Sequence, residues 1–348
     1  MDHLAELKEF ARLHGRSQGL TEQHVQAVLS RISGDRPGDP HSWAQVWTAE
    51  GDALRQGGHP LDACRHYALA RFPHHGDEDR QLAQDRCVEA FDTWRRSGRA
   101  GIERLEFDHP DGTMAAWAAG LSADRPRPLL LIMGGIVSVK EQWAPLLPLF
   151  ARLGFAAVAT EMPGVGENTL AYRADSWRLL PHLLDQLAGR ARVTETAMLA
   201  LSFSGHLALA AAAEDARIRS VHTVGAPVSD FFTDPAWWPK VPGITVETLR
   251  RLTRTEDDDE LRGVLAQFPL TPPRLGSLDI AVAYVASSRD EIIPQAEHRR
   301  LALLLPQARF KVFDDVHGSP EHVGAMRRWL VLSLLRARLG GRRAVRAG

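Results

Sequence analysis

The feature that most constrains the fold is a series of short apolar runs that alternate with helical patterns after Gly101. The runs occupy residues 129–133, 155–160, 196–201, 221–224, 280–286 and 310–313. Apolar residues at helical spacing lie between most of them, as in 143–153 and 177–187. Short apolar strands that alternate with helices are typical of βαβ units. The sequence therefore predicts an α/β fold, with a mostly parallel sheet and helices on both faces.

Two segments depart from this alternation. Residues 102–107 and 114–119 flank the turn sequence Asp-His-Pro-Asp-Gly, which predicts a β-hairpin ahead of the parallel strands. The segment at about 230–278 is long, is rich in Pro, Trp and acidic residues, and separates two predicted strands. We expect it to be an inserted helical lid over one end of the sheet.

The first hundred residues show helical periodicity without a convincing strand. Trp43, Gly51, Gly58 and Tyr67 resemble a single tetratricopeptide repeat, but no second copy follows. Since about three repeats are needed to bury a solenoid core, a helical hairpin that packs on a neighbour fits better. We predict a helical N-terminal cap domain at 1–100, a core at 101–338 and a basic, flexible tail at 339–348.

Composition excludes several classes of protein. Over 348 residues, 42 Lys and Arg balance 43 Asp and Glu, whereas nucleic-acid binders usually carry a basic excess. The two cysteines cannot build a disulfide framework or a four-cysteine zinc site, and no His, Cys or acidic cluster has metal-ligand spacing. The sequence begins without the pattern of a signal peptide, and its longest uncharged stretch, 196–213, is too polar to span a membrane. We expect a cytoplasmic protein without a metal, a nucleic-acid partner or a membrane partner.

The most informative segment follows the predicted strand at 196–201. Ser202 stands where the strand pattern stops and a helix pattern starts, as the nucleophile of a strained strand–turn–helix elbow does. The elbow needs small residues two positions before and after the serine, and here these are Ala200 and Ser204 instead of glycines. Ser202 is a better candidate than Ser204, which would put His206 at a crowded position. A helix-capping serine is the alternative interpretation.

Two further residues follow in the chain order of α/β-hydrolases, which is serine, acid and then histidine. Asp290 comes after the predicted strand at 280–286, and His317 comes after the last predicted strand. A serine hydroxyl becomes a good nucleophile when an imidazole takes its proton, and a carboxylate orients that imidazole. Ser202, Asp290 and His317 are therefore the predicted catalytic residues.

Other residues compete for these roles. Asp290 could instead be the N-cap of a helix at 294–304. Glu291, Asp314 and Asp315 are rival acids, and His322 is a rival base that we expect within the final amphipathic helix.

An oxyanion hole is the fourth element of such a site. One backbone N–H comes from the residue after the nucleophile, here Phe203, and another comes from the loop after the strand at 129–133. Gly134 and Gly135 allow close approach in that loop. Ile136 or Gly135 is therefore the expected second donor.

The substrate-lining residues are less well defined. Glu161 and Glu167 flank a Pro-Gly-Val-Gly loop and could line the pocket, although structural roles fit them better. The remaining candidates, one on the helix after Ser202 and three aromatic residues in the lid, are His206, Phe231, Trp237 and Trp238. Such aromatic side chains indicate a hydrophobic pocket, but core packing explains them equally well.

The segment 134–141 has the form Gly-Gly-x-x-Ser-x-Lys-Glu. It resembles the corresponding stretch of the α/β-hydrolases grouped with the fermentation–respiration switch protein, dihydroxypseudooxynicotine hydrolase and the fungal heptaketide hydrolases. The Trp43…Gly58…Tyr67 pattern, the Pro-Gly-x-Gly loop at 163–166 and the Asp290-x-Ile292-x-Pro294 stretch resemble that group too. The resemblance covers about residues 40–335.

The resemblance implies an α/β-hydrolase fold with an all-helical N-terminal cap, no cofactor and frequent dimerisation. It assigns the triad to Ser202, Asp290 and His317, and the oxyanion amides to Ile136 and Phe203. We therefore expect a serine hydrolase that cleaves an acyl or β-dicarbonyl bond, whether ester, thioester or C–C, of a bulky and fairly apolar small molecule. An acyltransferase or cyclase that uses the same site, and a non-catalytic regulatory binding protein on the same fold, are the alternatives.

Overall fold

The computed structural model describes residues 3–98 and 101–347, and it confirms an α/β fold. Its described strands form one sheet in the order β1-β2-β4-β3-β5-β6-β7-β8. Strands β1 and β2 pair antiparallel and join β4 antiparallel, and the other pairs are parallel. Their bounds are β1 Glu103–His109, β2 Gly112–Ala119, β3 Pro128–Met133, β4 Ala156–Thr160, β5 Arg192–Leu201, β6 Ile218–Val224, β7 Ala281–Ser287 and β8 Arg309–Phe313.

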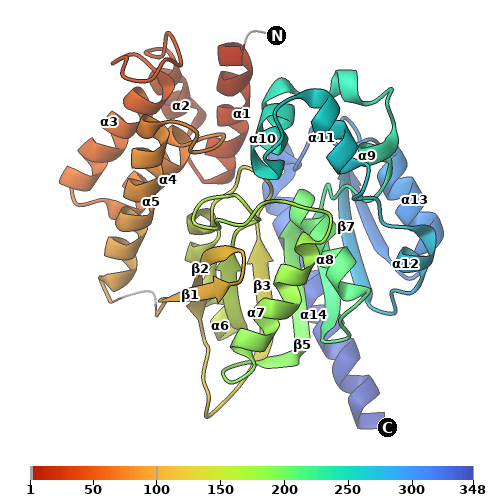
Figure 1. The fold of residues 1–348 in the computed structure, drawn as a ribbon. Helices are drawn as coiled ribbons and strands as arrows, with labels where there is room; N and C mark the ends of the chain where they lie inside the picture. The colour runs from red at the N-terminus through yellow and green to blue at the C-terminus, as the bar shows by residue number, and fades with distance from the viewer. Residues whose placement is uncertain (1–2, 99–100, 348) are drawn as a thin grey trace.

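Helices cover both faces of this sheet, and the carboxyl ends of the parallel strands meet at one edge (Figure 1). Helices α7 and α8 lie on the near face in this view, and α6 and α14 lie behind it. The core helices are α6 Leu147–Arg152, α7 Leu179–Leu187, α8 Phe203–Ala212, α13 Ala296–Leu304 and α14 Val323–Ala347. The apolar runs of β3 and β4 form strands that are buried on both faces, whereas the edge strand β8 is largely exposed.

The N-terminal part has helices and no named strand among its described residues, and it packs beside the sheet (Figure 1). Its helices are α1 His3–Ser17, α2 Glu22–Leu29, α3 Trp43–Gln56, α4 Pro60–Ala70 and α5 Glu78–Arg96. Phe91 of α5 contacts the ring of Trp117 in β2, with centroids 4.9 Å apart, so the helices share the sheet's apolar core. The domain boundary predicted at residue 100 lies outside the described residues.

The segment between β6 and β7 is helical, and in Figure 1 it lies over the carboxyl edge of the sheet. Its helices are α9 Asp230–Thr233, α10 Gly243–Thr253, α11 Asp258–Leu265 and α12 Pro272–Gly276. Helix α10 contacts the N-terminal helices: Glu6 accepts the backbone N–H of Ile244, and His74 lies 3.1 Å from the Glu247 carboxylate. The two parts of the chain therefore meet above the sheet edge.

Two sequence predictions need correction. The predicted helix at 143–153 is divided into a 3₁₀ turn at Ala144–Leu146 and α6, because the prolines at 145 and 148 cannot donate helical hydrogen bonds. His322 ends a separate 3₁₀ turn just before α14. In the segment predicted as a flexible tail, 339–348, the backbone is helical as far as Ala347, and its flexibility stays a prediction.

Within residues 3–98 and 101–347, no helix combines the length and the apolar character that a membrane crossing requires.

The helical hairpin of α3 and α4 depends on Gly51. A Cβ at this position would lie 2.5 Å from Cε1 of Tyr67, which is closer than packed atoms tolerate. We expect Gly51→Ala to lower the free energy of unfolding by about 1–3 kcal/mol, measured by urea unfolding. The matched control is Gly263→Ala in α11, where a Cβ meets no atom within 4 Å and alanine favours the helix. Equal stability of the two variants would contradict the close packing of α3 on α4.

Candidate active site

Ser202 lies in the turn between β5 and α8, in a backbone conformation that L-residues rarely adopt. Its φ is 58° and its ψ is −129°. Its backbone N–H donates to the carbonyl of Val224 at 2.7 Å, which ties the turn to the end of β6. A strained serine between a strand and a helix is the geometry of a nucleophile elbow.

The two departures from the glycine pattern fit this turn. Ala200 is fully buried in β5, between Met133 of β3 and Thr223 of β6. The Ser204 hydroxyl lies 2.9 Å from the carbonyl oxygens of both Met133 and Leu201. Because the small side chains fit and the buried hydroxyl has acceptors, the elbow keeps its shape without the glycines.

Ser202, His317 and Asp290 form a continuous hydrogen-bonded chain. The Ser202 Oγ lies 2.9 Å from Nε2 of His317, and Nδ1 of the same ring lies 2.9 and 3.0 Å from the two carboxylate oxygens of Asp290. Asp290 Oδ1 also accepts the backbone N–H groups of Ile292 and Ile293, at 3.0 and 2.7 Å. The carboxylate is therefore fixed where it can orient the imidazole.

The surroundings of His317 tune its basicity. Burial lowers the pKa of the imidazole, but the charge and hydrogen bond of Asp290 and the charge of Glu291 outweigh burial and raise the pKa above its usual value. Gly225 lies beside the ring with a φ of 58°, and a Cβ there would lie 2.7 Å from Cε1 of His317. Glycine fits here because it adopts the positive φ without strain and has no Cβ to collide with the ring.

The rival residues have other partners. Asp314 is exposed and pairs with Arg289, whereas Asp315 is buried and holds Nδ1 of His322 at 2.9 Å. Glu291 accepts the backbone N–H of His317 at 2.9 Å and does not bond its ring. Helix α13 begins at Ala296 with Gln295 as its N-cap, so Asp290 does not cap that helix.

The loop after β3 lies against the nucleophile. A Cβ at Gly135 would lie 3.0 Å from Cβ of Ser202 and 3.5 Å from its Oγ, and Ile136 follows on the wall of the same cavity. Phe203 is the first residue of α8, where backbone N–H groups have no acceptor within the helix. Both segments are therefore placed where backbone donors can face a negative oxygen that forms beside Ser202.

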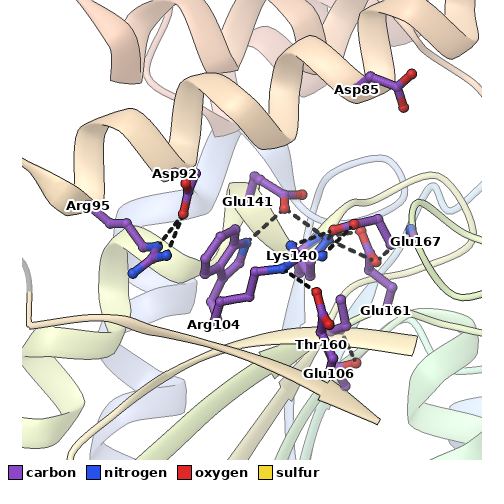
Figure 2. A network of polar contacts seen from close by, with 12 residues as sticks. Asp85, Asp92, Arg95, Arg104, Glu106, Lys140, Glu141, Thr160, Glu161 and Glu167 are labelled. Atoms are coloured by element: carbon purple, nitrogen blue, oxygen red, sulfur yellow. Dashed lines mark hydrogen bonds and ion pairs between the residues drawn. The ribbon is translucent and has the colours of Figure 1, made fainter. Parts of the chain in front are cut away.

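A buried ion network holds the loop after β3 in place. Figure 2 shows Lys140 among three carboxylates, at 2.9 Å from Glu141, 3.3 Å from Glu161 and 2.6 Å from Glu167. Arg104 of β1 forms two hydrogen bonds to Glu167, at 2.7 and 3.0 Å. The conspicuous Lys-Glu pair of the sequence motif thus joins the loops after β3 and β4 to the edge of the sheet.

Charge balance within this network sets the protonation of its members. Burial raises the pKa of Glu161 to about 7. The attraction of Lys140 opposes this rise, and the negative charges of Glu141 and Glu167 add to it. Burial would raise the pKa of Glu167 as well. The hydrogen bonds and positive charges of Arg104 and Lys140 outweigh burial and lower this pKa to about 2. Lys140 keeps its charge, since the carboxylates outweigh the burial that would lower its pKa.

Arg71 connects the N-terminal helices to the same loop. Its guanidinium is buried and donates to the carbonyl of Val137 at 2.8 Å and to that of Pro73 at 2.7 Å. Val137 directly follows Ile136, so the helical region holds the backbone beside the expected oxyanion donors.

A cavity of about 300 Å³ opens at Ser202 and His317. Its walls come from α1, the loop after β3, α6, β5, β6, α10 and α14, and most of the lining side chains are apolar. Representative members are Leu13, Ile136, Leu201, Val224, Met326 and Leu330. The candidate nucleophile thus faces a largely apolar chamber, which suits an apolar substrate.

The predicted lining residues lie elsewhere. Glu161 is in the ion network. Nε2 of His206 lies 2.8 Å from the carbonyl of Phe268, so this imidazole binds the lid. Phe231 packs edge-on against Phe203, Trp238 packs against Phe231, and the Trp237 N–H donates to Ile292. The structure does not place these five residues on the cavity wall, because the lid needs the aromatic rings for its own core.

The sequence does not indicate where His14 and Arg71 lie relative to the site. His14 of α1 lines the cavity although it is 188 residues before Ser202 in the chain, and Arg71 holds the oxyanion loop from the helical region. Only the docking of the helices on the sheet brings them there. In the part of the chain that the structure describes, no three His, Cys, Asp or Glu side chains are grouped as metal ligands would be.

Fold, elbow and hydrogen-bonded chain together define the class of this protein: it is an α/β-hydrolase. The model of the FrsA-like esterases matches residues 40–276, and the chain therefore belongs to the FrsA-like esterase family. This confirms the group that the Gly-Gly…Lys-Glu motif suggested.

Solved structures agree with this assignment. AbyA5 is 48% identical with a TM-score of 0.93, over 97% of this chain and 95% of that chain. The 2,6-dihydroxy-pseudo-oxynicotine hydrolase is 21% identical with a TM-score of 0.72, over 92% and 96% of the two chains, which is a likeness in fold.

Among curated relatives, Esterase FrsA of Vibrio cholerae serotype O1 is 24% identical over 271 residues, which is 70% of this chain and 65% of that protein. Esterase FrsA of Klebsiella pneumoniae is 27% identical over 237 residues, which is 66% of this chain and 57% of that protein. The matches thus span somewhat less than two thirds of these relatives' length.

Lys140→Met tests the ion network. The substitution leaves Glu141 and Glu161 fully buried with their principal cation removed, and breaking a buried pair in this way costs about 3–5 kcal/mol. We expect a loss of that size in the free energy of unfolding, measured with urea at neutral pH. The matched control is Arg55→Met, which breaks an exposed pair with Glu89 and should cost less than about 1 kcal/mol. Equal losses in the two variants would contradict the role given to Lys140.

Proposed function

We propose that this protein is a serine hydrolase that cleaves an acyl or β-dicarbonyl bond, whether ester, thioester or C–C, of a bulky and fairly apolar small molecule. The observation that carries the proposal is the hydrogen-bonded chain Ser202–His317–Asp290 at the head of an apolar cavity. Membership of an esterase family and the α/β-hydrolase fold support it.

The reaction would follow from the geometry. His317 takes the proton of Ser202 through Nε2 as Oγ attacks the substrate carbonyl, and Asp290 stabilises the imidazolium. The negative oxygen of the tetrahedral intermediate accepts hydrogen bonds from the amides of Phe203 and Ile136, or Gly135. When the intermediate collapses, His317 gives its proton to the leaving group and an ester bond to Ser202 remains.

Water then completes the cycle. His317 removes a proton from a water molecule, the resulting hydroxide adds to the acyl carbon, and Ser202 leaves with the proton that His317 returns. For an ester or thioester the first leaving group is an alcohol or thiol. For a β-dicarbonyl compound it is a stabilised carbanion, which needs the same proton on carbon, and His317 is the expected donor.

A cytoplasmic location, a homodimeric state and the division into cap and core stay predictions. The substrate is expected to be a small molecule rather than a nucleic acid or a membrane component, in keeping with the net charge of −1.

A fluorophosphonate probe tests the nucleophile. We expect the probe to label the wild-type protein and to leave Ser202→Ala unlabelled, and we expect this variant to lose about 10⁴-fold or more in kcat on an aryl ester. Ser204→Gly is the matched control, because it restores the usual elbow residue two positions away and should still be labelled. An unlabelled wild type, or equal labelling of Ser202→Ala, would refute the enzymatic proposal in favour of a binding protein.

The pH profile tests His317 as the base. The base must be neutral, and its pKa is raised above 6.5, so kcat/KM should fall as the pH drops through a midpoint above 6.5. Asp290→Asn removes the main group that raises the pKa and leaves burial to lower it. The midpoint should therefore move to a lower pH, with a loss of about 10⁴-fold in rate. A wild-type midpoint below 6.5, or one that Asp290→Asn does not move, would contradict the assignment.

A further inference from the structure

His14 is a histidine of the N-terminal helices that reaches the cavity of the candidate active site. It lies in the last turn of α1, and its side chain lines the same chamber as Ser202 and His317. Its ring packs against Phe72, with centroids 4.9 Å apart. The residue is half-buried.

The ring nitrogens of His14 have no hydrogen-bond partner among the described residues. Two other histidines with little exposed surface have at least one ring nitrogen hydrogen-bonded within the protein, although Nδ1 of His206 has no partner. In His66, Nδ1 lies 2.7 Å from the carbonyl of Asp62 and Nε2 lies 2.7 Å from His24, and in His206 Nε2 lies 2.8 Å from the carbonyl of Phe268. His14 is half-buried, so its ring nitrogens remain free to bind water or a ligand. The position on a cavity wall indicates a ligand.

The charge state of His14 restricts that ligand. Burial, together with the nearby positive charges of Arg71 and His317, lowers its pKa to about 4. The imidazole is therefore neutral at pH 7, with one nitrogen as donor and the other as acceptor. A neutral imidazole suits a carbonyl or hydroxyl oxygen better than a carboxylate or phosphate, which would call for a cation.

Several neighbouring polar groups of the wall have hydrogen-bond partners within the protein. The Ser17 hydroxyl donates to the carbonyl of His14, Arg327 donates to the carbonyl of Ser17, and Glu291 accepts the N–H of His317. The other side chains beside His14 on α1 are the apolar Phe10 and Leu13. His14 therefore adds a neutral hydrogen-bonding side chain beside the apolar Phe10 and Leu13.

We propose that His14 is a specificity-determining residue, which hydrogen-bonds a second, uncharged oxygen of the substrate while Ser202 attacks the scissile carbonyl. The substrate is then an oxo- or hydroxy-acyl compound with an apolar remainder. This inference rests on the proposed function and adds to it the substrate group that the helical region recognises.

The experiment compares aryl esters that differ in one oxygen. Hexanoate, 3-oxohexanoate and 5-oxohexanoate esters of the same phenol are hydrolysed by the wild type, His14→Phe and His14→Gln, and kcat and KM are measured for each. Phenylalanine keeps the ring packing on Phe72 and removes the hydrogen bond, whereas glutamine keeps a neutral donor and acceptor. Leu13→Ala is the control for a changed cavity wall, and thermal unfolding verifies that all variants are folded.

We expect the wild type to prefer one oxo ester over hexanoate in kcat/KM, and His14→Phe to reduce that preference about fivefold, the effect of one net hydrogen bond. The loss should appear mainly as a higher KM for the oxo ester. His14→Gln should restore part of the preference. Leu13→Ala should change kcat/KM by a similar factor for all three esters. The inference is overturned if the wild type shows no preference for either oxo ester, or if His14→Phe changes all three esters equally. Failure of the wild type to hydrolyse any ester, together with no fluorophosphonate labelling, would instead refute the proposed function.

Discussion

The buried ammonium of Lys140 is the interaction on which the site's geometry depends most. It is fully buried, and three carboxylates from the loops after β3 and β4 surround it. Its own backbone N–H is also held, since it donates to Glu161 at 3.1 Å. Because moving any of these groups would leave a charge buried without its partner, the loop that contains Gly135 and Ile136 has one low-energy position. Catalysis by preorganised backbone donors requires such a loop to be rigid before the substrate arrives.

The same loop is where the helical N-terminal region enters the site. Arg71 donates to Val137 on the loop, and the Trp117 indole, which packs on Phe91 of α5, donates to Glu141 in the ion network at 2.8 Å. These contacts link the N-terminal helices to the loop by hydrogen bonds to a main-chain carbonyl and to a buried carboxylate. The helices are therefore part of the support of the active site, and not only a cover over it.

Much of this could be predicted from the sequence, because the signals are local. Ser202, Asp290 and His317 each follow a predicted strand, so parallel topology alone places them at one edge of the sheet. The Lys-Glu pair at 140–141 was visible as a motif, but its function in an ion network was not, since its partners come from other loops and from β1.

The residues that line the pocket could not be predicted from the sequence. An aromatic residue packs in a lid core or on a cavity wall by the same apolar contact, so composition does not distinguish the two, and Phe231, Trp237 and Trp238 serve the lid. His14 shows the converse case. Nothing about a histidine in an amphipathic helix indicates a site, and its place beside His317 exists only after α1 has docked near the lid and α14. Specificity in such a chain is set by long-range packing, while the chemistry is set by short motifs, and this explains why the reaction class can be inferred from sequence more readily than the substrate.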